Sequence, residues 1–139
     1  MSVVFFTDRD LGHQFPAILR TAGLAVERHT DHFLPDCDDA VWLPEVAKRG
    51  WVTLTHDTRI RYKPNELAAV RRHGVALFVV VGSSPHAELA RNFVRTATRI
   101  ATLAERHEPP YIAKVHRPSP SDLARHPNAP GTVTRWFPS

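Results

Sequence analysis

The chain has 139 residues, 42% hydrophobic and 23% charged, so it is long enough for one domain with a core and too short for two of ordinary size. It contains no run near the roughly 20 apolar residues of a membrane span, no basic leader region at its start, and a single cysteine, which excludes an internal disulfide. Lys and Arg outnumber Asp and Glu by 18 to 14, which favours an anionic partner such as nucleic acid. We expect a soluble, cytoplasmic protein with no membrane partner.

Short apolar runs alternate with helical patterns along most of the chain. Four runs have the composition of strands, at residues 3–7, 24–29, 51–55 and 75–81. Helices are predicted between and after them, with glycine, proline or aspartate at their ends, at residues 11–23, 39–50, 64–73 and 85–107. This alternation predicts an α/β fold, a three-layer α/β/α sandwich with a mainly parallel sheet.

The composition changes after residue 107. Seven of the twelve prolines lie in residues 108–139, and only residues 111–115 there have the pattern of a further strand. We therefore predict a first domain over residues 1–107 and a Pro-rich, basic C-terminal extension over residues 108–139. The aromatic residues Trp136 and Phe137 favour packing of this extension on the domain or on a partner over disorder.

Aspartates follow the first and third predicted strands. Asp8 and Asp10 come after residues 3–7, and Asp57 comes after residues 51–55. The carboxyl ends of parallel strands meet at one edge of a sheet, where open α/β sheets bind their ligands. Carboxylates that gather there repel one another unless a hard cation neutralises them, so this layout predicts a site for Mg²⁺ or Mn²⁺.

Each of these aspartates also has a purely structural interpretation. Asp8 or Asp10 could cap the first helix, and Asp57 could close an Asx turn after its strand. A further acid is expected from a cluster before the second helix, where Asp39 competes with Asp36 and Asp38 for the role. We favour Asp39, because Trp42 follows it by one helical turn.

Polar and basic residues flank the proposed cation ligands. Arg9 follows Asp8, and a second group follows Asp57, comprising Thr58, Arg59 and Arg61. These side chains could contact the phosphates of RNA, and the alternative is that they form an ordinary solvated surface. The chain contains no Gly-x-Ser-x-Gly, no Gly-x-x-x-x-Gly-Lys and no Gly-x-Gly-x-x-Gly sequence, so nothing indicates a serine hydrolase or a nucleotide-binding loop.

Three segments together resemble a known family. Phe-Phe-Thr-Asp-Arg-Asp-Leu-Gly at residues 5–12, Asp-Ala-Val-Trp-Leu at residues 39–43 and Arg-Gly-Trp-Val-Thr-Leu-Thr-His-Asp at residues 49–57 resemble the PIN-like domains of VapC-type toxins. The resemblance covers roughly residues 3–107, and it implies a metal-dependent endoribonuclease that hydrolyses RNA as the toxin of a toxin–antitoxin pair. Many PIN domains carry a further acid after a later strand, where this chain has Gly82-Ser83-Ser84.

The resemblance also implies roles for individual residues and partners. Asp8, Asp39 and Asp57 match the catalytic, metal-binding acids, and Asp10 would be an accessory metal ligand. The cation would be Mg²⁺ or Mn²⁺, the substrate RNA, and a cognate antitoxin would cover the acidic site. A homodimer remains open.

Two other classes of protein remain open. A catalytically inert PIN-like binding module would keep the fold without the metal, in line with the absent late carboxylate. A phosphoacceptor receiver-like domain would use acids after the first strand, Asp57 after the third, Ser83 after the fourth and Lys114 after the fifth. A receiver has no need of Asp39 on a helix, which argues against that class.

Overall fold

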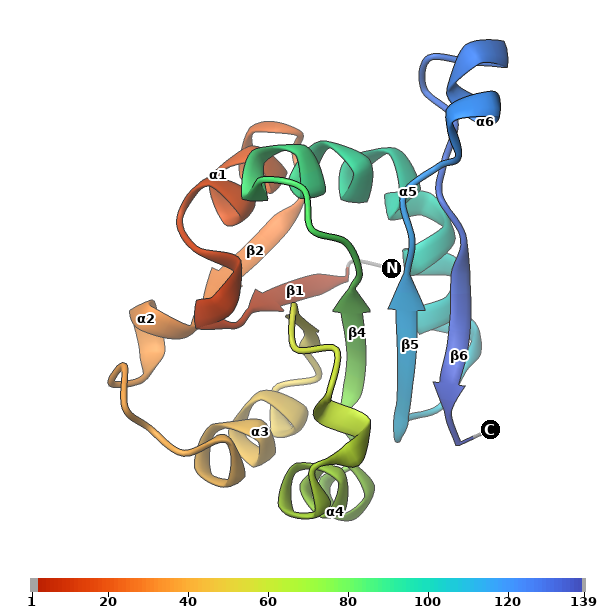
Figure 1. Cartoon of the computed structure of the whole chain (residues 1–139). Coiled ribbons are helices and arrows are strands. Elements are labelled where there is room, and N and C mark those ends of the chain that lie inside the picture. Colours follow the sequence, from red (N-terminus) through yellow and green to blue (C-terminus); the bar gives the residue numbers. More distant parts are fainter. Residues whose placement is uncertain (1–2, 139) are drawn as a thin grey trace.

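The computed structural model describes residues 3–138, except for the side chain of Arg61, and has a six-stranded sheet at its centre (Figure 1). The strands, in chain order, are β1 (Val4–Thr7), β2 (Ala25–Arg28), β3 (Val52–Thr55), β4 (Ala76–Val80), β5 (Tyr111–Val115) and β6 (Val133–Phe137). Their order across the sheet is β2-β1-β3-β4-β5-β6. The first five strands are parallel, and β6 pairs antiparallel with β5 at the edge.

Helices cover both faces of this sheet. They are α1 (Gln14–Thr21), α2 (His29–His32), α3 (Asp39–Lys48), α4 (Pro64–His73), α5 (His86–Arg106) and α6 (Pro120–Arg125), with 3₁₀ turns η1 (Arg9–Leu11) and η2 (Ile60–Tyr62). Helices α1 and α5 lie on one face, and α3 and α4 lie on the other (Figure 1). Within residues 3–138, no helix is both long enough and apolar enough to cross a membrane.

Strand alternation divides the core into two layers. Phe5 points to the face of α1 and α5, where its ring lies 5.3 Å edge-on from that of Phe93. Its neighbour Phe6 points to the opposite face and packs against Trp42 of α3, with ring centroids 5.3 Å apart. Successive side chains of a strand face opposite ways, so one Phe-Phe pair anchors helices on both sides of β1.

The predicted α/β fold with a mainly parallel sheet is confirmed. The helix predicted from residue 11 begins only at Gln14, because Gly12 adopts φ +68° and ends η1 before α1 starts. The short helix α2 occupies a segment for which no helix was predicted.

The prediction of one strand after residue 107 was wrong, because β6 also joins the sheet, after the unpredicted helix α6. Strand β6 pairs on one side only, and Thr134 and Arg135 are exposed, so it lacks the apolar run of a buried strand. Its aromatic end packs as expected, with Lys114 Nζ 4.0 Å from the centre of the Trp136 ring and Phe137 buried beneath Arg71. The division of the chain at residue 107 stays a prediction, although residues 111–137 complete the same sheet.

Candidate active site

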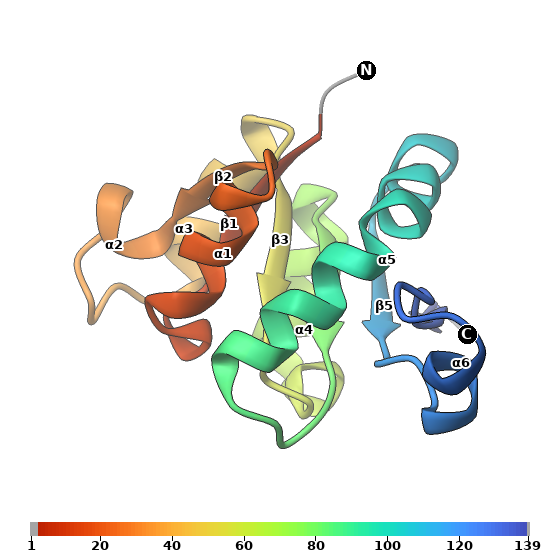
Figure 2. The same cartoon turned by 90° about the horizontal axis from the view of Figure 1, so that it is seen from above.

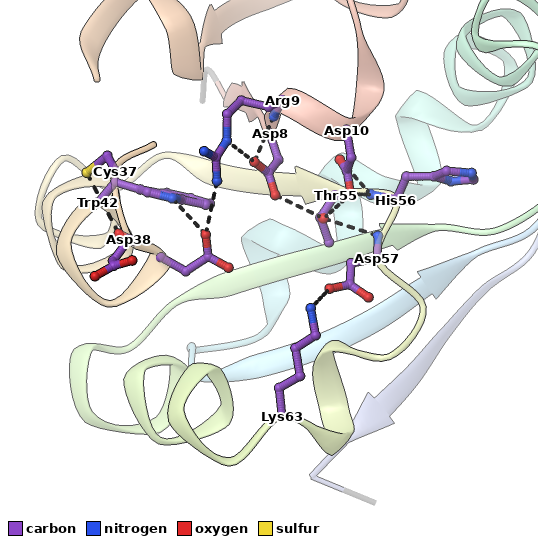
Figure 3. Close-up of polar contacts among 11 residues, drawn as sticks. Asp8, Arg9, Asp10, Cys37, Asp38, Trp42, Thr55, His56, Asp57 and Lys63 are labelled. Carbon is purple, nitrogen blue, oxygen red and sulfur yellow. Dashed lines mark hydrogen bonds and ion pairs between the residues drawn. The ribbon is translucent and has the colours of Figure 1, made fainter. Parts of the chain in front are cut away.

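The adjacent parallel strands β1 and β3 deliver acids to the same edge of the sheet. Thr7, the last residue of β1, pairs with Leu54 of β3, and the chain continues past the edge from both strands. Asp8 and Asp10 therefore lie beside Thr55, the last residue of β3 (Figure 3). Asp8 is also the N-cap of η1, since its carboxylate accepts a hydrogen bond from the backbone N–H of Arg9 at 2.7 Å.

The Thr55 hydroxyl lies between the two carboxylates. Its Oγ1 is 3.3 Å from Asp8 Oδ2 and 3.0 Å from Asp10 Oδ2. The hydroxyl carries one hydrogen and can donate it to only one of these oxygens at a time. Asp10 has further support from the backbone N–H of His56, which lies 3.1 and 3.0 Å from its two oxygens. The two carboxylates are thus held together with fewer donors than their ionised oxygens can use.

This arrangement shifts the pKa values of both acids upward. Burial, followed by repulsion from Asp10, raises the pKa of Asp8 to about 6. Burial also raises the pKa of Asp10, partly offset by the hydrogen bonds from the His56 backbone and the Thr55 side chain. Desolvation and a like charge both disfavour the ionised form of a carboxyl group. A cation placed between these side chains would relieve both effects.

Asp39 lies on the far side of Arg9 from this pair. It is the first residue of α3, and its Oδ1 accepts a hydrogen bond from Trp42 Nε1 at 3.0 Å. The guanidinium of Arg9 lies 3.5 Å from Asp39 and 3.7 Å from Asp8, so it joins the two carboxylates. Arg9, predicted to contact RNA, is therefore engaged with the acids. Asp38 occupies the N-cap position of α3, but its side chain makes no capping hydrogen bond.

Asp57 is placed at the same edge but turns toward Lys63 (Figure 3). Its Oδ2 forms a short ion pair with the Lys63 ammonium, and its Oδ1 accepts from the backbone N–H of Arg59 at 2.9 Å, the Asx turn that was the alternative interpretation. Burial raises the pKa of Asp57, but the hydrogen bonds from Lys63 and Arg59 outweigh it and hold the pKa below its usual value. The link to the other acids runs through its backbone N–H, which donates to Thr55 Oγ1 at 3.2 Å.

Two of the remaining predicted contacts lie on the surface beside Asp57. Thr58 and Arg59 are exposed, and the side chain of Arg61 lies outside the described part of the chain. Sequence reasoning did not assign Lys63 a role, and its only local signal is its place just before Pro64, the first residue of α4. The structure thus joins Asp8 and Asp10 through the Thr55 hydroxyl, and it pairs Asp39 with Arg9 and Asp57 with Lys63.

A histidine pair, His56 and His86, lies near the end of β4. His56 Nδ1 lies 2.7 Å from the carbonyl oxygen of Val80 at the end of β4. A carbonyl only accepts, so Nδ1 carries the hydrogen of this bond. The His86 ring lies 6.3 Å from that of His56 and packs over Gly12, where an added Cβ would sit 2.7 Å from His86 Nδ1. Glycine is therefore favoured at position 12 for two reasons: its positive φ and the close approach of the His86 ring.

A cavity of about 240 Å³ opens beside Asp8 and is also lined by Arg9 and His29. Thr7 pairs with Arg28, so the residues that follow, Asp8 and His29, lie on adjacent strand ends. The His29 side chain is only 1% exposed, and neither ring nitrogen has a hydrogen-bond partner within residues 3–138. Burial lowers its pKa and keeps the ring neutral. No spacing in the sequence pointed to this residue.

Among the described residues, no group of three or more His, Cys, Asp or Glu side chains is close enough to form a metal site by itself. Asp8 and Asp10, which share the Thr55 hydroxyl, form a pair of carboxylates. Lys114, which a receiver domain would place beside its phosphoacceptor, lies instead over the ring of Trp136. This edge of the sheet therefore carries two carboxylates joined through Thr55, and two further carboxylates that are paired with Arg9 and Lys63.

Comparison with known families agrees with this architecture. A family model described as a PIN like domain matches residues 3–82, which is more than half of the chain and includes Asp8, Asp39 and Asp57. The chain belongs to the PIN-like domain family. Comparison with curated proteins gave no match, and neither did comparison with solved structures. PIN domains are generally nucleases that use divalent metals, so the family favours a nuclease and leaves the VapC-type assignment untested.

Proposed function

We propose that this protein is a metal-dependent endoribonuclease that hydrolyses RNA at the edge carrying Asp8 and Asp10. The observation that carries the proposal is the position of these two carboxylates on either side of the Thr55 hydroxyl, where burial leaves both with raised pKa values. Two acids held together against their own repulsion are costly for stability. Such a cost at a sheet edge is typical of a site built for a cation.

The residues at this edge fit Mg²⁺ or Mn²⁺. Both cations prefer oxygen ligands, and Mg²⁺ is usually held by one or two carboxylates together with waters and substrate phosphates. A pair of carboxylates is therefore a sufficient protein contribution, even though no larger ligand group exists within residues 3–138. When bound, the cation would polarise the scissile phosphate and lower the pKa of a bound water.

The protein's own residues then have distinct roles. Asp8 and Asp10 would hold the cation, and the Thr55 hydroxyl keeps their facing oxygens in register. Asp57 remains ionised at neutral pH because Lys63 and Arg59 lower its pKa, so it can orient a water by accepting its hydrogen. Arg9 lies between Asp8 and Asp39, where its guanidinium could contact a phosphate of bound RNA.

The finer proposal is that the enzyme is the toxin of a toxin–antitoxin pair that acts on cytoplasmic RNA. It is supported by the resemblance of residues 5–12, 39–43 and 49–57 to VapC-type toxins. A cognate antitoxin would bind over the acidic edge, where a basic side chain could pair with Asp8 and Asp10 as a cation would. Co-expression with the neighbouring gene product would test this assignment through relief of growth arrest.

The nuclease is tested by incubating purified protein with a mixed RNA pool in Mn²⁺ or Mg²⁺. We expect cleavage that is lost in Asp8→Asn and in Asp10→Asn and kept in Asp36→Asn, since Asp36 is an exposed acid outside the site. Circular dichroism spectra would show that all variants are folded. Folded protein without cleavage in either metal would favour the inert binding module instead.

A further inference from the structure

A second cavity, of about 470 Å³, lies away from the acidic pair, between α5, α6 and the segments that flank α6. Its lining is rich in basic side chains, contributed by Arg99, Arg117, Arg125 and His126. Asp122 is the acidic residue of that lining, and it pairs with Arg125 at 3.5 Å. With three arginines against one carboxylate, the lining of the cavity carries net positive charge even without a contribution from His126.

The cavity is held by specific contacts with Gly131. The Gly131 backbone N–H donates to the buried hydroxyl of Thr96 at 2.9 Å, and the Arg99 guanidinium donates to the Gly131 carbonyl at 2.9 Å. A Cβ on Gly131 would lie 1.7 Å from the carbonyl oxygen of His116, so only glycine allows this close approach. Helix α5 and the segment before β6 are therefore joined in one arrangement that positions Arg99.

The cavity and the acids lie along the same edge of the sheet. Strand β5 is parallel to β1, β3 and β4, so the segment that leaves β5 after Val115 starts at the edge where Asp8 and Asp10 lie. Figure 2 shows α6 beyond the arrowhead of β5. Three strand spacings separate β1 from β5, which is roughly 14 Å at about 4.8 Å each. An extended nucleic-acid strand could span this distance.

Two of the cations nearest the acids are already engaged with carboxylates. Arg9 is paired with Asp8 and Asp39, and Lys63 is paired with Asp57. Carboxylates at that end repel phosphates, so positive charge elsewhere along the edge would add to the affinity for a polyanion. Arginine suits the task because its planar fork matches phosphate oxygens.

We propose that the cavity formed by Arg99, Arg117 and Arg125 binds phosphates of the RNA backbone and holds the strand whose scissile bond lies at the acidic pair. That the nucleic acid is RNA rests on the proposed function. Phosphate contacts of this kind position a nucleic acid without reading its sequence. The C-terminal segment would thus supply affinity, and the edge between β1 and β3 would supply the chemistry.

The test is RNA binding without cleavage, measured by fluorescence anisotropy of a labelled single-stranded RNA in EDTA over a range of salt concentrations. The cavity variant is Arg117→Gln/Arg125→Gln. The matched control is Lys48→Gln/Arg72→Gln, which removes the same charge near the ends of α3 and α4, at the opposite edge of the sheet. The single variant Arg117→Gln preserves the pair between Arg125 and Asp122 and serves if the double variant loses stability.

We expect the cavity variant to bind about tenfold more weakly and its salt dependence to fall by about 0.7 in log–log slope for each lost contact, with the control close to unmodified protein. Equal losses in both variants, no loss in the cavity variant, or no RNA binding by unmodified protein would each overturn the proposal. The result does not depend on hydrolysis. If the protein does not cleave RNA but the cavity variant still binds more weakly than the control variant, only the nuclease proposal is refuted. If the protein cleaves RNA but the two variants bind equally well, only the cavity proposal is refuted.

Discussion

Replacing Thr55 with Val removes the hydroxyl between Asp8 and Asp10 while keeping the shape of the side chain. The hydroxyl donates to an ionised carboxylate, and such a hydrogen bond contributes about 1.5–3 kcal/mol. Without it, Asp10 ionises less readily, and the facing oxygens of the two acids are no longer held in register. We expect Thr55→Val to weaken Mn²⁺ binding by roughly ten- to a hundredfold, which is this energy expressed as a ratio of affinities.

Thr53, two residues before Thr55, offers a matched control. Thr53 lies on the same strand, is fully buried, and its hydroxyl has no hydrogen-bond partner among the described residues. Thr53→Val should therefore leave the stability and the Mn²⁺ affinity nearly unchanged. Calorimetric titration of Mn²⁺ into both variants gives the affinities, and RNA cleavage rates give the consequence for catalysis. Equal Mn²⁺ affinities in Thr55→Val and Thr53→Val would refute the bridging role of Thr55.

Three further predictions concern the neighbouring acids. Native Asp8 holds its proton up to about pH 6, whereas the unfolded chain releases it near 3.8, so the native state binds more protons in this window and stability falls as the pH rises. In EDTA, Asp8→Asn should therefore raise the free energy of unfolding by about 3 kcal/mol above about pH 7 and change it little below about pH 4, as urea denaturation would show; a destabilised variant at neutral pH would contradict this. Lys63→Ala should raise the pKa of Asp57, move the acidic limb of the cleavage profile to higher pH, and cost at most about 1 kcal/mol, because the pair is partly exposed. An unmoved acidic limb would refute that role for Lys63. Trp42→Phe keeps the packing but removes the hydrogen bond to Asp39, so we expect a loss of about 1–2 kcal/mol in thermal unfolding and slower cleavage with unchanged RNA binding in EDTA. Unchanged cleavage would exclude Asp39 from the site.

The central strands could be predicted from sequence because their apolar runs are nearly unbroken. Residues 3–7, 51–55 and 75–81 contain β1, β3 and β4, whose side chains are buried on both faces. Strand β6 could not be predicted in this way, since it pairs on one side only and its pattern mixes exposed and buried positions. Its place depends on β5, which is distant in the sequence. Local patterns carry no information about such a pairing.

The residues of the candidate site also differ in how well local sequence patterns predict their positions. Asp8 and Asp10 could be placed at the sheet edge because they directly follow a strand. The ion pair of Asp57 with Lys63 depends on the path of η2, and the burial of His29 depends on the packing of α2 against α3. Both arise from loop conformations that no spacing encodes. The sequence indicated the edge at which acids gather and ranked Asp10 as accessory, whereas the structure joins Asp10 to Asp8 through Thr55 and pairs Asp39 and Asp57 with basic side chains.

The most direct test of the account is the cleavage of an end-labelled RNA by the unmodified protein in Mn²⁺, in Mg²⁺ and in EDTA, with analysis of the product ends. Attack by water on the phosphate leaves no cyclic phosphate, whereas attack by the neighbouring 2′-hydroxyl does. We expect cleavage that EDTA abolishes, that added Mn²⁺ restores, and that yields no 2′,3′-cyclic phosphate. Folded protein that cleaves with neither cation, or that cleaves equally well in EDTA, would contradict a metal-dependent hydrolysis at Asp8 and Asp10.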